Sequence, residues 1–228
     1  MIFRSIKRIT LFLFILIFLP VLHCVHSKAE SSGLNNLLFN TAFEMIDESG
    51  VPEGWYEDAY RLNAGYTGFQ ILNMDVSGEN KAVLRIQNFD LNDARLAQTV
   101  QVRPESLYHI SALIMAEHIE EGHGANISIE GLYAFSEEIF DTNGEWKRVD
   151  WYGETGPDQH DVTIFLRLGG YSGESRGKAF FTDVQMEEAD ELPDDIVAAL
   201  WFDTAKPAVM LTMMKRRMLP FLHGLCFS

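Results

Sequence analysis

The sequence predicts an all-β fold, an antiparallel two-sheet β-sandwich of the jelly-roll type. Ten short segments rich in β-branched and aromatic residues recur along the chain, and several alternate apolar with polar positions. That period of two is typical of a strand with one buried face. Turn-forming residues such as Ser77-Gly78 and Asn143-Gly144 separate the segments, and no long helical period lies between them. Many short strands without helices favour two sheets packed face to face.

The expected strands cover residues 37–43, 55–60, 69–74, 82–88, 96–102, 108–116, 125–132, 146–152, 162–168 and 179–186. The alternation in two of them is strict. In one, Tyr108, Ile110, Ala112, Ile114 and Ala116 share a face, and in another, Val162, Ile164, Leu166 and Leu168 do so. These faces are predicted to form the core, so the intervening residues are predicted to point outward.

The first 29 residues have the pattern of a secretory signal peptide. Basic residues at Arg4, Lys7 and Arg8 precede an apolar run, and small residues follow it up to Ala29. We expect cleavage after Ala29, which makes the protein secreted or places it on the extracellular face of the cell membrane. An uncleaved anchor is the alternative, but about 14 apolar residues interrupted by Pro20 are few for a membrane span.

The remaining chain is strongly acidic and lacks a disulfide framework. The formal net charge of the whole chain is −15, and residues 1–29 hold four of its basic residues and none of its acidic ones. Such a surface excludes nucleic acid as a ready partner. The two cysteines, Cys24 and Cys226, lie near opposite ends of the chain. The folded body must therefore be held by its apolar core, which favours a bacterial exported domain.

A boundary is predicted where a run of acidic residues with a proline, residues 187–195, stops the alternation. The sandwich is accordingly expected to span residues 34–190. Residues 191–228 are expected to be an irregular or weakly helical tail, either poorly ordered or the truncated start of a longer polypeptide.

Several short motifs resemble a known family in their order and spacing. They are Asn40–Glu44, Gly54-Trp55, Ala97–Pro104, Tyr108–Ala112, Trp146 and Ala179–Val184. Over about Leu34–Glu188 the chain resembles the bacterial carbohydrate-binding modules of families 4 and 9, which have a galactose-binding-like jelly roll. The resemblance implies non-catalytic recognition of poly- or oligosaccharide, as an accessory to a carbohydrate-active enzyme.

Two further segments, residues 125–154 and 170–177, are similar to exported modules that precede bacterial membrane glycosyltransferases. This chain ends before any transmembrane bundle, so the resemblance implies no transferase activity. It leaves open a structural or adhesion module from a truncated membrane glycosyltransferase, and a face paved with aliphatic side chains would indicate that function.

Sugars are recognised by aromatic rings together with carboxylate, amide and Arg groups that hydrogen-bond hydroxyls. The candidate carbohydrate-binding residues are Glu130, Tyr133, Trp151, Arg167, Tyr171 and Arg176. Glu130, Trp151 and Arg167 are expected to line one concave sheet, with the tyrosines at its rim and Arg176 beside Tyr171 in a Gly-rich loop. Two alternatives remain open: Trp151 anchors the core, and Arg167 merely pairs with Glu130 across strands.

In the resembled modules, acids at the positions of Glu44 and Asp183 help to hold a structural Ca²⁺ between the first and last strands. Oxygen ligands suit that ion. The alternative is that both acids cap turns or face solvent. The histidines offer no zinc spacing, because His118 and His123 have no partner pair.

No catalytic signature is present in the sequence. It lacks a nucleophile elbow, a phosphate-binding loop and a zinc-protease helix motif. We therefore expect no enzyme activity. A glycoside hydrolase that uses Glu130 or Glu154 on the same scaffold is the alternative, since such enzymes need two carboxylates facing one cleft.

Overall fold

The computed structural model describes residues 36–203 and confirms the all-β prediction. The strands are β1 (Tyr56–Ala59), β2 (Thr67–Val76), β3 (Glu79–Asn92), β4 (Ala94–Gln101), β5 (Leu107–Glu120), β6 (Ala125–Ile129), β7 (Lys147–Glu154), β8 (Asp161–Leu168), β9 (Ser175–Glu188) and β10 (Ala199–Leu200). Over the same range no helix is long and apolar enough to cross a membrane.

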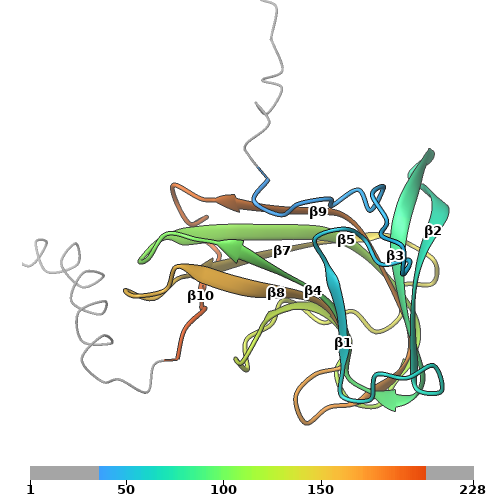
Figure 1. Ribbon diagram of the computed structural model, residues 1–228. Coiled ribbons are helices and arrows are strands. Elements are labelled where there is room, and N and C mark those ends of the chain that lie inside the picture. Colours follow the sequence, from blue (N-terminus) through green and yellow to red (C-terminus); the bar gives the residue numbers. More distant parts are fainter. Residues whose placement is uncertain (1–35, 204–228) are drawn as a thin grey trace, which may run out of the picture. The chain divides into compact units, whose positions relative to one another are not determined.

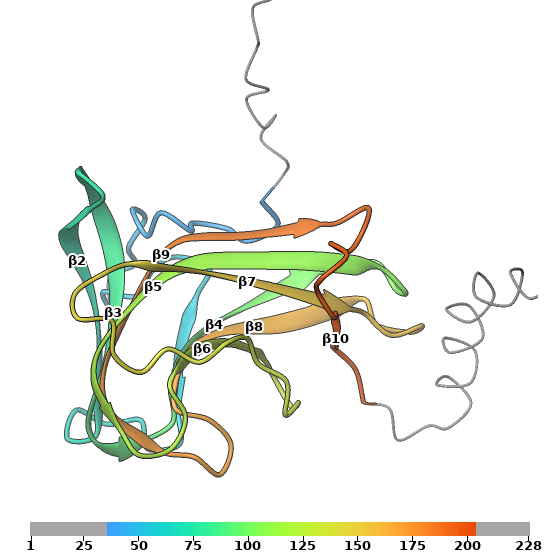
Figure 2. The same cartoon turned by 180° about the vertical axis from the view of Figure 1, so that it is seen from behind.

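The strands form two sheets packed as a sandwich (Figures 1 and 2). One sheet has four strands in the order β1-β4-β8-β6, and the other has six in the order β10-β7-β5-β9-β3-β2. Every pairing is antiparallel except that of β10 with β7. The predicted antiparallel two-sheet architecture is therefore correct, with one short parallel addition at an edge.

The core lies between the sheets and follows the predicted alternation. Ile110 and Ile114 of β5 and Ile164 and Leu166 of β8 are fully buried. Their sequence neighbours on β8 point to the other face of the four-stranded sheet. The alternation therefore sets both the core and the outer face that carries the candidate site.

A second, smaller apolar cluster lies on the outer face of the six-stranded sheet. It consists of Val76, Val83, Met115 and Phe180, which are buried although they face away from the main core. Figure 1 shows why: the β2–β3 hairpin stands up at the end of the sandwich and rises past β9. The hairpin and the sheet thus form a corner that shields these side chains.

The predicted strand over residues 37–43 is wrong. The backbone at Asn40 and Phe43 has positive φ angles of 50° and 53°, which a strand does not contain. The Asn40 amide donates to the carbonyl oxygens of Met45 (2.7 Å) and Glu53 (3.1 Å). The Asn40 side chain thus bonds to nearby backbone carbonyl groups and stabilises a local turn in place of a strand, as asparagine often does.

The sandwich also extends past the predicted boundary at residue 190. Trp201 is fully buried, 5.2 Å from Trp151 and 6.2 Å from Tyr108 between ring centroids. Its indole lies directly on Gly153, where a Cβ atom would come within 1.9 Å of it. The acidic run is therefore a connection that brings the chain back to the sandwich. The predicted signal peptide and the remainder of the predicted tail lie outside the described residues.

Candidate functional site

The outer face of the four-stranded sheet carries polar and aromatic side chains at matching positions of all four strands. Strand register places Asp58 opposite Arg95, Arg95 opposite Arg167, and Arg167 opposite Asn126. One step along, Tyr56, Ala97, Phe165 and Ser128 form the next row. Cross-strand neighbours of this kind lie close enough to interact directly.

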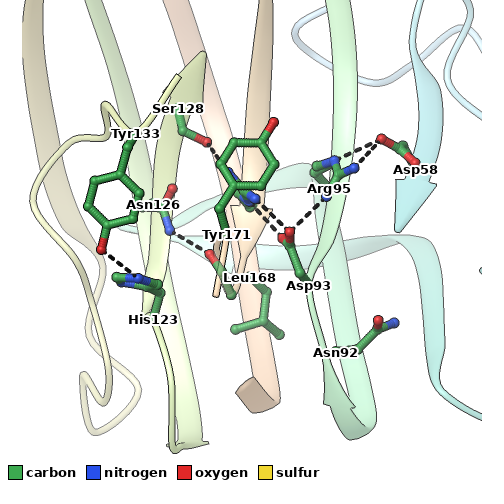
Figure 3. A network of polar contacts seen from close by, with 12 residues as sticks. Asp58, Asn92, Asp93, Arg95, His123, Asn126, Ser128, Tyr133, Leu168 and Tyr171 are labelled. Atoms are coloured by element: carbon green, nitrogen blue, oxygen red, sulfur yellow. Dashed lines mark hydrogen bonds and ion pairs between the residues drawn. The ribbon is translucent and has the colours of Figure 1, made fainter. Parts of the chain in front are cut away.

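The charged residues of the first row form a chain of alternating charges together with Asp93, which lies just before β4 (Figure 3). Asp58 accepts from Arg95 at 2.8 Å, and Arg95 donates to Asp93 at 2.9 Å. Asp93 in turn accepts two hydrogen bonds from Arg167, at 2.7 and 2.5 Å. A two-pronged arginine–carboxylate pair is the strongest and most directional form of this contact.

Burial increases along this chain. The exposed fraction of the side chain is 36% at Asp58 and 13% at Arg95, but only 7% at Asp93 and 2% at Arg167. The remaining nitrogen of Arg167, Nη1, donates to the Ser128 hydroxyl at 3.4 Å. Because the Arg167 guanidinium is paired on every side, it fixes the geometry of the face and is not available to a ligand.

The alternative interpretation, in which Arg167 pairs with Glu130, is therefore wrong. Its partner Asp93 lies just before β4 and was missed. The missed signal is the pattern Asp93-Ala-Arg95, which places two opposite charges two residues apart and hence on one face of the chain.

Tyr171 covers the buried end of the charge chain. The Arg167 guanidinium lies 4.1 Å from the centroid of its ring, a favourable cation–π distance. The Tyr171 hydroxyl accepts a hydrogen bond from the backbone of Gly131 at 3.1 Å, so the loop after β8 is joined to the loop after β6. The tyrosine is half-buried and keeps part of its surface open to solvent.

The neighbouring loop contains a second aromatic group (Figure 3). Tyr133 is 70% exposed, and its hydroxyl lies 3.2 Å from Nε2 of His123. The other nitrogen of this imidazole lies 2.8 Å from the Glu138 carboxylate. The histidine fits against Gly173, where any Cβ atom would clash with the ring. Tyr133 is therefore positioned by a defined set of contacts at the rim of the face.

Tyr56 on β1 is a second exposed tyrosine on the face, and sequence reasoning missed it. It is 44% exposed and lies beside the Thr99 and Thr163 hydroxyls, which are 2.9 Å apart. Partial burial, followed by the charge of Glu130, raises the pKa of the Tyr56 phenol. The phenol therefore stays protonated and able to donate a hydrogen bond. The signal for it was simple alternation, since Trp55 is buried and the next residue must point outward.

Glu130 lies at the end of β6, beside an open hollow of about 240 Å³. The hollow is lined by Ile129, Glu130, Leu132, Gln159, Asp161, Val162, Thr163, Trp201 and Phe202. Two carboxylates and one amide therefore face a space that also has aromatic walls. Carboxylate and amide groups of this kind can accept and donate to ligand hydroxyls.

The structure brings together four of the six predicted binding residues. Glu130, Tyr133, Arg167 and Tyr171 all lie on the outer face of the four-stranded sheet or on its loops. The Tyr171 hydroxyl accepts a hydrogen bond from the backbone of Gly131, and Glu130 is the residue before Gly131, so these two candidates lie close together.

The expected position of Trp151 is wrong. It lies on β7 of the other sheet, points into the core and is only 8% exposed. It packs against Trp201, so burial of two large aromatic rings decides its orientation. The structure thus places Trp151 where the alternative, a core anchor, predicted it.

The structure also does not group Arg176 with the four candidates of the four-stranded sheet. It belongs to β9 of the six-stranded sheet and not to the Gly-rich loop, and it pairs with Glu120 of β5. The strand begins earlier than expected, at Ser175. The register between β9 and β5 then places Arg176 opposite Glu120.

Glu44 and Asp183, the expected calcium ligands, have different surroundings in the structure. Glu44 is exposed, whereas the Asp183 carboxylate lies 2.8 Å from the ammonium group of Lys81. Within residues 36–203 no group of three His, Cys, Asp or Glu side chains is arranged to hold a metal ion. The structural calcium ion stays a prediction, and Lys81 is a competing cation for one of its ligands.

No protein-family model and no curated protein matches the chain. Among solved structures it is similar to the enzymatically active domain of tailspike protein 4 of bacteriophage CBA120, with 11% identity and a TM-score of 0.48, over 68% of this chain and 21% of that one. It is also similar to a CBM4 structure (16% identity, TM-score 0.43, 66% and 99% covered). A third similar structure is TmCBM61 in complex with β-1,4-galactotriose, with 14% identity and a TM-score of 0.45, over 68% of this chain and 99% of that one.

The similar structures thus include carbohydrate-binding modules, the kind of protein that the sequence motifs resemble. The matched part of this chain corresponds to only about a fifth of the tailspike domain. Identities and TM-scores at this level do not assign a function.

Proposed function

We propose that the protein is an exported, non-catalytic carbohydrate-binding module that binds poly- or oligosaccharide on the outer face of the four-stranded sheet. One observation carries the proposal. The buried pair of Asp93 and Arg167 holds the Tyr171 ring in place, and the open, carboxylate-lined hollow beside Glu130 borders the same face, where the core residues Ile129, Val162 and Trp201 also line it. Rigid aromatic rings beside hydrogen-bonding groups suit a ligand with both C–H faces and hydroxyls.

Each group has a distinct task in this proposal. Tyr56 and Tyr171 supply apolar surface for the faces of sugar rings. Glu130, Asp161 and Gln159 accept and donate hydrogen bonds from the hollow. Arg95 and Arg167 act indirectly, because their guanidinium groups are occupied by Asp58 and Asp93. Preorganised groups of this kind lose little freedom when they bind.

Calorimetry with soluble neutral glycans and gel retardation with cell-wall polysaccharides test the proposal on the full chain. We expect Tyr56→Ala and Tyr171→Ala each to weaken binding about five- to tenfold, the range expected for one aromatic contact. Phe140→Ala is the matched control, because Phe140 is as exposed as Tyr56, at 44%, but does not line the hollow. Binding that is absent, or unchanged in both tyrosine variants, would contradict the proposed site.

One observation favours a second candidate, a glycoside hydrolase: Glu130 and Asp161 line the same hollow. Two carboxylates flanking a bond are the usual catalytic pair of these enzymes. Incubation with the polysaccharide that binds best, followed by analysis of reducing ends, distinguishes the two. We expect no product; product that disappears in Glu130→Gln would establish the enzyme instead.

The export and partner parts of the proposal rest on the sequence. The basic and apolar pattern of residues 1–29 supports secretion or display on the extracellular face of the membrane. Cell fractionation tests this, and replacing Ile15 with Arg inside the apolar run should retain the protein in the cytoplasm. The proposed partner is a carbohydrate-active enzyme or a membrane glycosyltransferase, to which the module would bring its glycan.

A further inference from the structure

A hollow of about 340 Å³ lies on the opposite sheet, away from the proposed site. It is lined by Gln87, Asn88, Phe89, Glu117, His118, Glu120, Arg176, Gly177 and Lys178. Register places Gln87 opposite Lys178 and Lys178 opposite Glu117. Their neighbours Ile86, Ala179 and Ala116 are fully buried in the core, so this row points outward from the six-stranded sheet.

The hollow exists because β9 loses register with both of its neighbours at the same place. On the β5 side, His118 and Ile119 lie opposite the single residue Gly177. Gly177 has a φ of 138°, and a Cβ atom there would lie 2.6 Å from the carbonyl oxygen of His118, so only glycine fits. On the β3 side the register shifts between Asn88 and Asn92. Bulges of this type bend strands and redirect side chains, and they are frequent next to binding sites.

The irregular backbone is held firmly from below. The Asn88 side chain is 2% exposed, and its amide nitrogen lies 3.0 Å from the carbonyl oxygens of Asn92 and Ser175 and 3.3 Å from that of Leu168. Its oxygen accepts from the Thr67 hydroxyl at 2.9 Å. One buried amide therefore ties together four segments beneath the hollow, which fixes the hollow's shape.

The walls combine an exposed ring with open ion pairs. Phe89 is 49% exposed and lies across Gly68, which has no side chain to displace it. Lys178 pairs with Glu117 at 3.0 Å, and Arg176 pairs with Glu120. These four side chains are 35–58% exposed, so each keeps hydrogen-bonding capacity toward solvent.

We propose that this hollow is a second glycan-binding site, for a neutral sugar with adjacent hydroxyl groups. The C–H face of a sugar ring would lie on Phe89. A hydroxyl both donates and accepts, and each ion pair offers a donor and an acceptor side by side. A uronate would meet Glu117 and Glu120, and an amino sugar would meet Lys178 and Arg176, so the balanced charges select a neutral ligand.

Calorimetry and ¹⁵N amide shifts of the full chain, titrated with β-1,4-linked gluco-, xylo-, galacto- and manno-oligosaccharides, test the inference. Polygalacturonate serves as the charged comparison. We expect two binding events, one of which perturbs Gly68 and Gly177. Phe89→Ala should weaken that event about five- to tenfold and leave the other unchanged. Tyr171→Ala should do the reverse, and Phe140→Ala should change neither.

The two proposals fail separately in this design. Neutral glycan binding that perturbs only the four-stranded sheet, unchanged in Phe89→Ala, overturns the second site and leaves the first. Binding lost in Phe89→Ala alone, with both tyrosine variants unaffected, supports the second site and overturns the first. Perturbation of Gly177 by polygalacturonate alone overturns the neutral ligand class. Melting curves confirm that each variant is folded, and Phe89→Tyr should restore binding.

Discussion

The outer faces of both sheets carry ion pairs between acidic and basic side chains, but these pairs differ in how far they are buried. On the four-stranded sheet, Asp93 and Arg167 are nearly inaccessible and bind each other. On the six-stranded sheet, the side chains of the pairs Lys178 with Glu117 and Arg176 with Glu120 are 35–58% exposed. A buried pair fixes the surface around it because separating it would leave a buried charge unpaired, at a high free-energy cost. In an exposed pair, each group can bind water or a ligand in place of its partner. Ion pairs thus act as scaffold on one face and as contact groups on the other.

Removing Asp93 tests this comparison most severely. Asp93→Ala leaves Arg167 charged, buried and without its carboxylate, so we expect the free energy of unfolding to fall by about 3–5 kcal/mol. Glu117→Gln on the other sheet is the matched change, and we expect a loss of about 0.5 kcal/mol or less. Denaturant titration of both variants measures the difference. Similar losses in the two variants would remove the distinction between scaffold and contact pairs.

Trp201 tests whether the returning C-terminal segment completes the four-stranded site. Trp201→Ala empties a fully buried position and should cost about 3 kcal/mol of unfolding free energy. Because Trp201 also lines the hollow beside Glu130, glycan binding on that face should weaken while the hollow at Phe89 is unaffected. Val197→Ala, at an 84% exposed position of the same segment, should change neither quantity. An unchanged stability in Trp201→Ala would return the domain boundary to residue 190.

Trp201 also separates the features of the fold that the sequence predicts from those that it does not. Alternation predicted the core of β5 and β8 and the outward positions of Arg167 and Glu130, because a period of two is a local property of a strand. The return of Trp201 was not predictable, since its signal is the fit of an indole on Gly153, more than 40 residues earlier. Trp151 was misplaced for the same reason, because the ring it packs against lay in a segment interpreted as a tail.

The residues of the candidate site also fall into those that local alternation predicts and those that depend on long-range contacts. Its members on regular strands follow from alternation, as Tyr56 would have done. The pairing of Arg167 with Asp93 and the separation of Arg176 from Tyr171 depend on strand order and on two bulges. Strand order is a long-range property that no local pattern contains.

Salt should separate the two kinds of pair in a double-mutant cycle. For Lys178 and Glu117 we expect a coupling energy of about 0.5 kcal/mol at low salt that nearly vanishes in 1 M NaCl, where screening acts over about 3 Å. The coupling between Asp93 and Arg167 should persist, because solvent ions do not reach it. A buried coupling that is screened equally would show that water enters the charge chain.

Acid should release the open pair at Glu120. A hydrogen bond from Arg176, followed by its charge, lowers the pKa of the Glu120 carboxyl. The folded-state value lies below the unfolded one, so the pair stabilises the protein above the unfolded pKa of about 4.3, and the contribution is lost as the pH falls through the lowered value. Wild type and Glu120→Gln should differ slightly at pH 7 and converge in acid. A difference that grows on acidification would reverse this sign.

The smallest expected effect is that of Ca²⁺ on the melting temperature. This effect depends on the ion pair between Lys81 and Asp183. The Lys81 ammonium lies 2.8 Å from the Asp183 carboxylate, so a calcium ion that used this ligand would have to displace it. We expect added Ca²⁺ to raise the melting temperature of Lys81→Met by more than that of the wild type, and to have no effect on Asp183→Asn. Mg²⁺ at the same concentration is the control for ionic strength, since it demands a tighter octahedral shell. Melting temperatures that Ca²⁺ leaves unchanged in both the wild type and Lys81→Met would contradict a calcium site at Asp183, and this carboxylate would then serve only to pair β9 with β3 through Lys81.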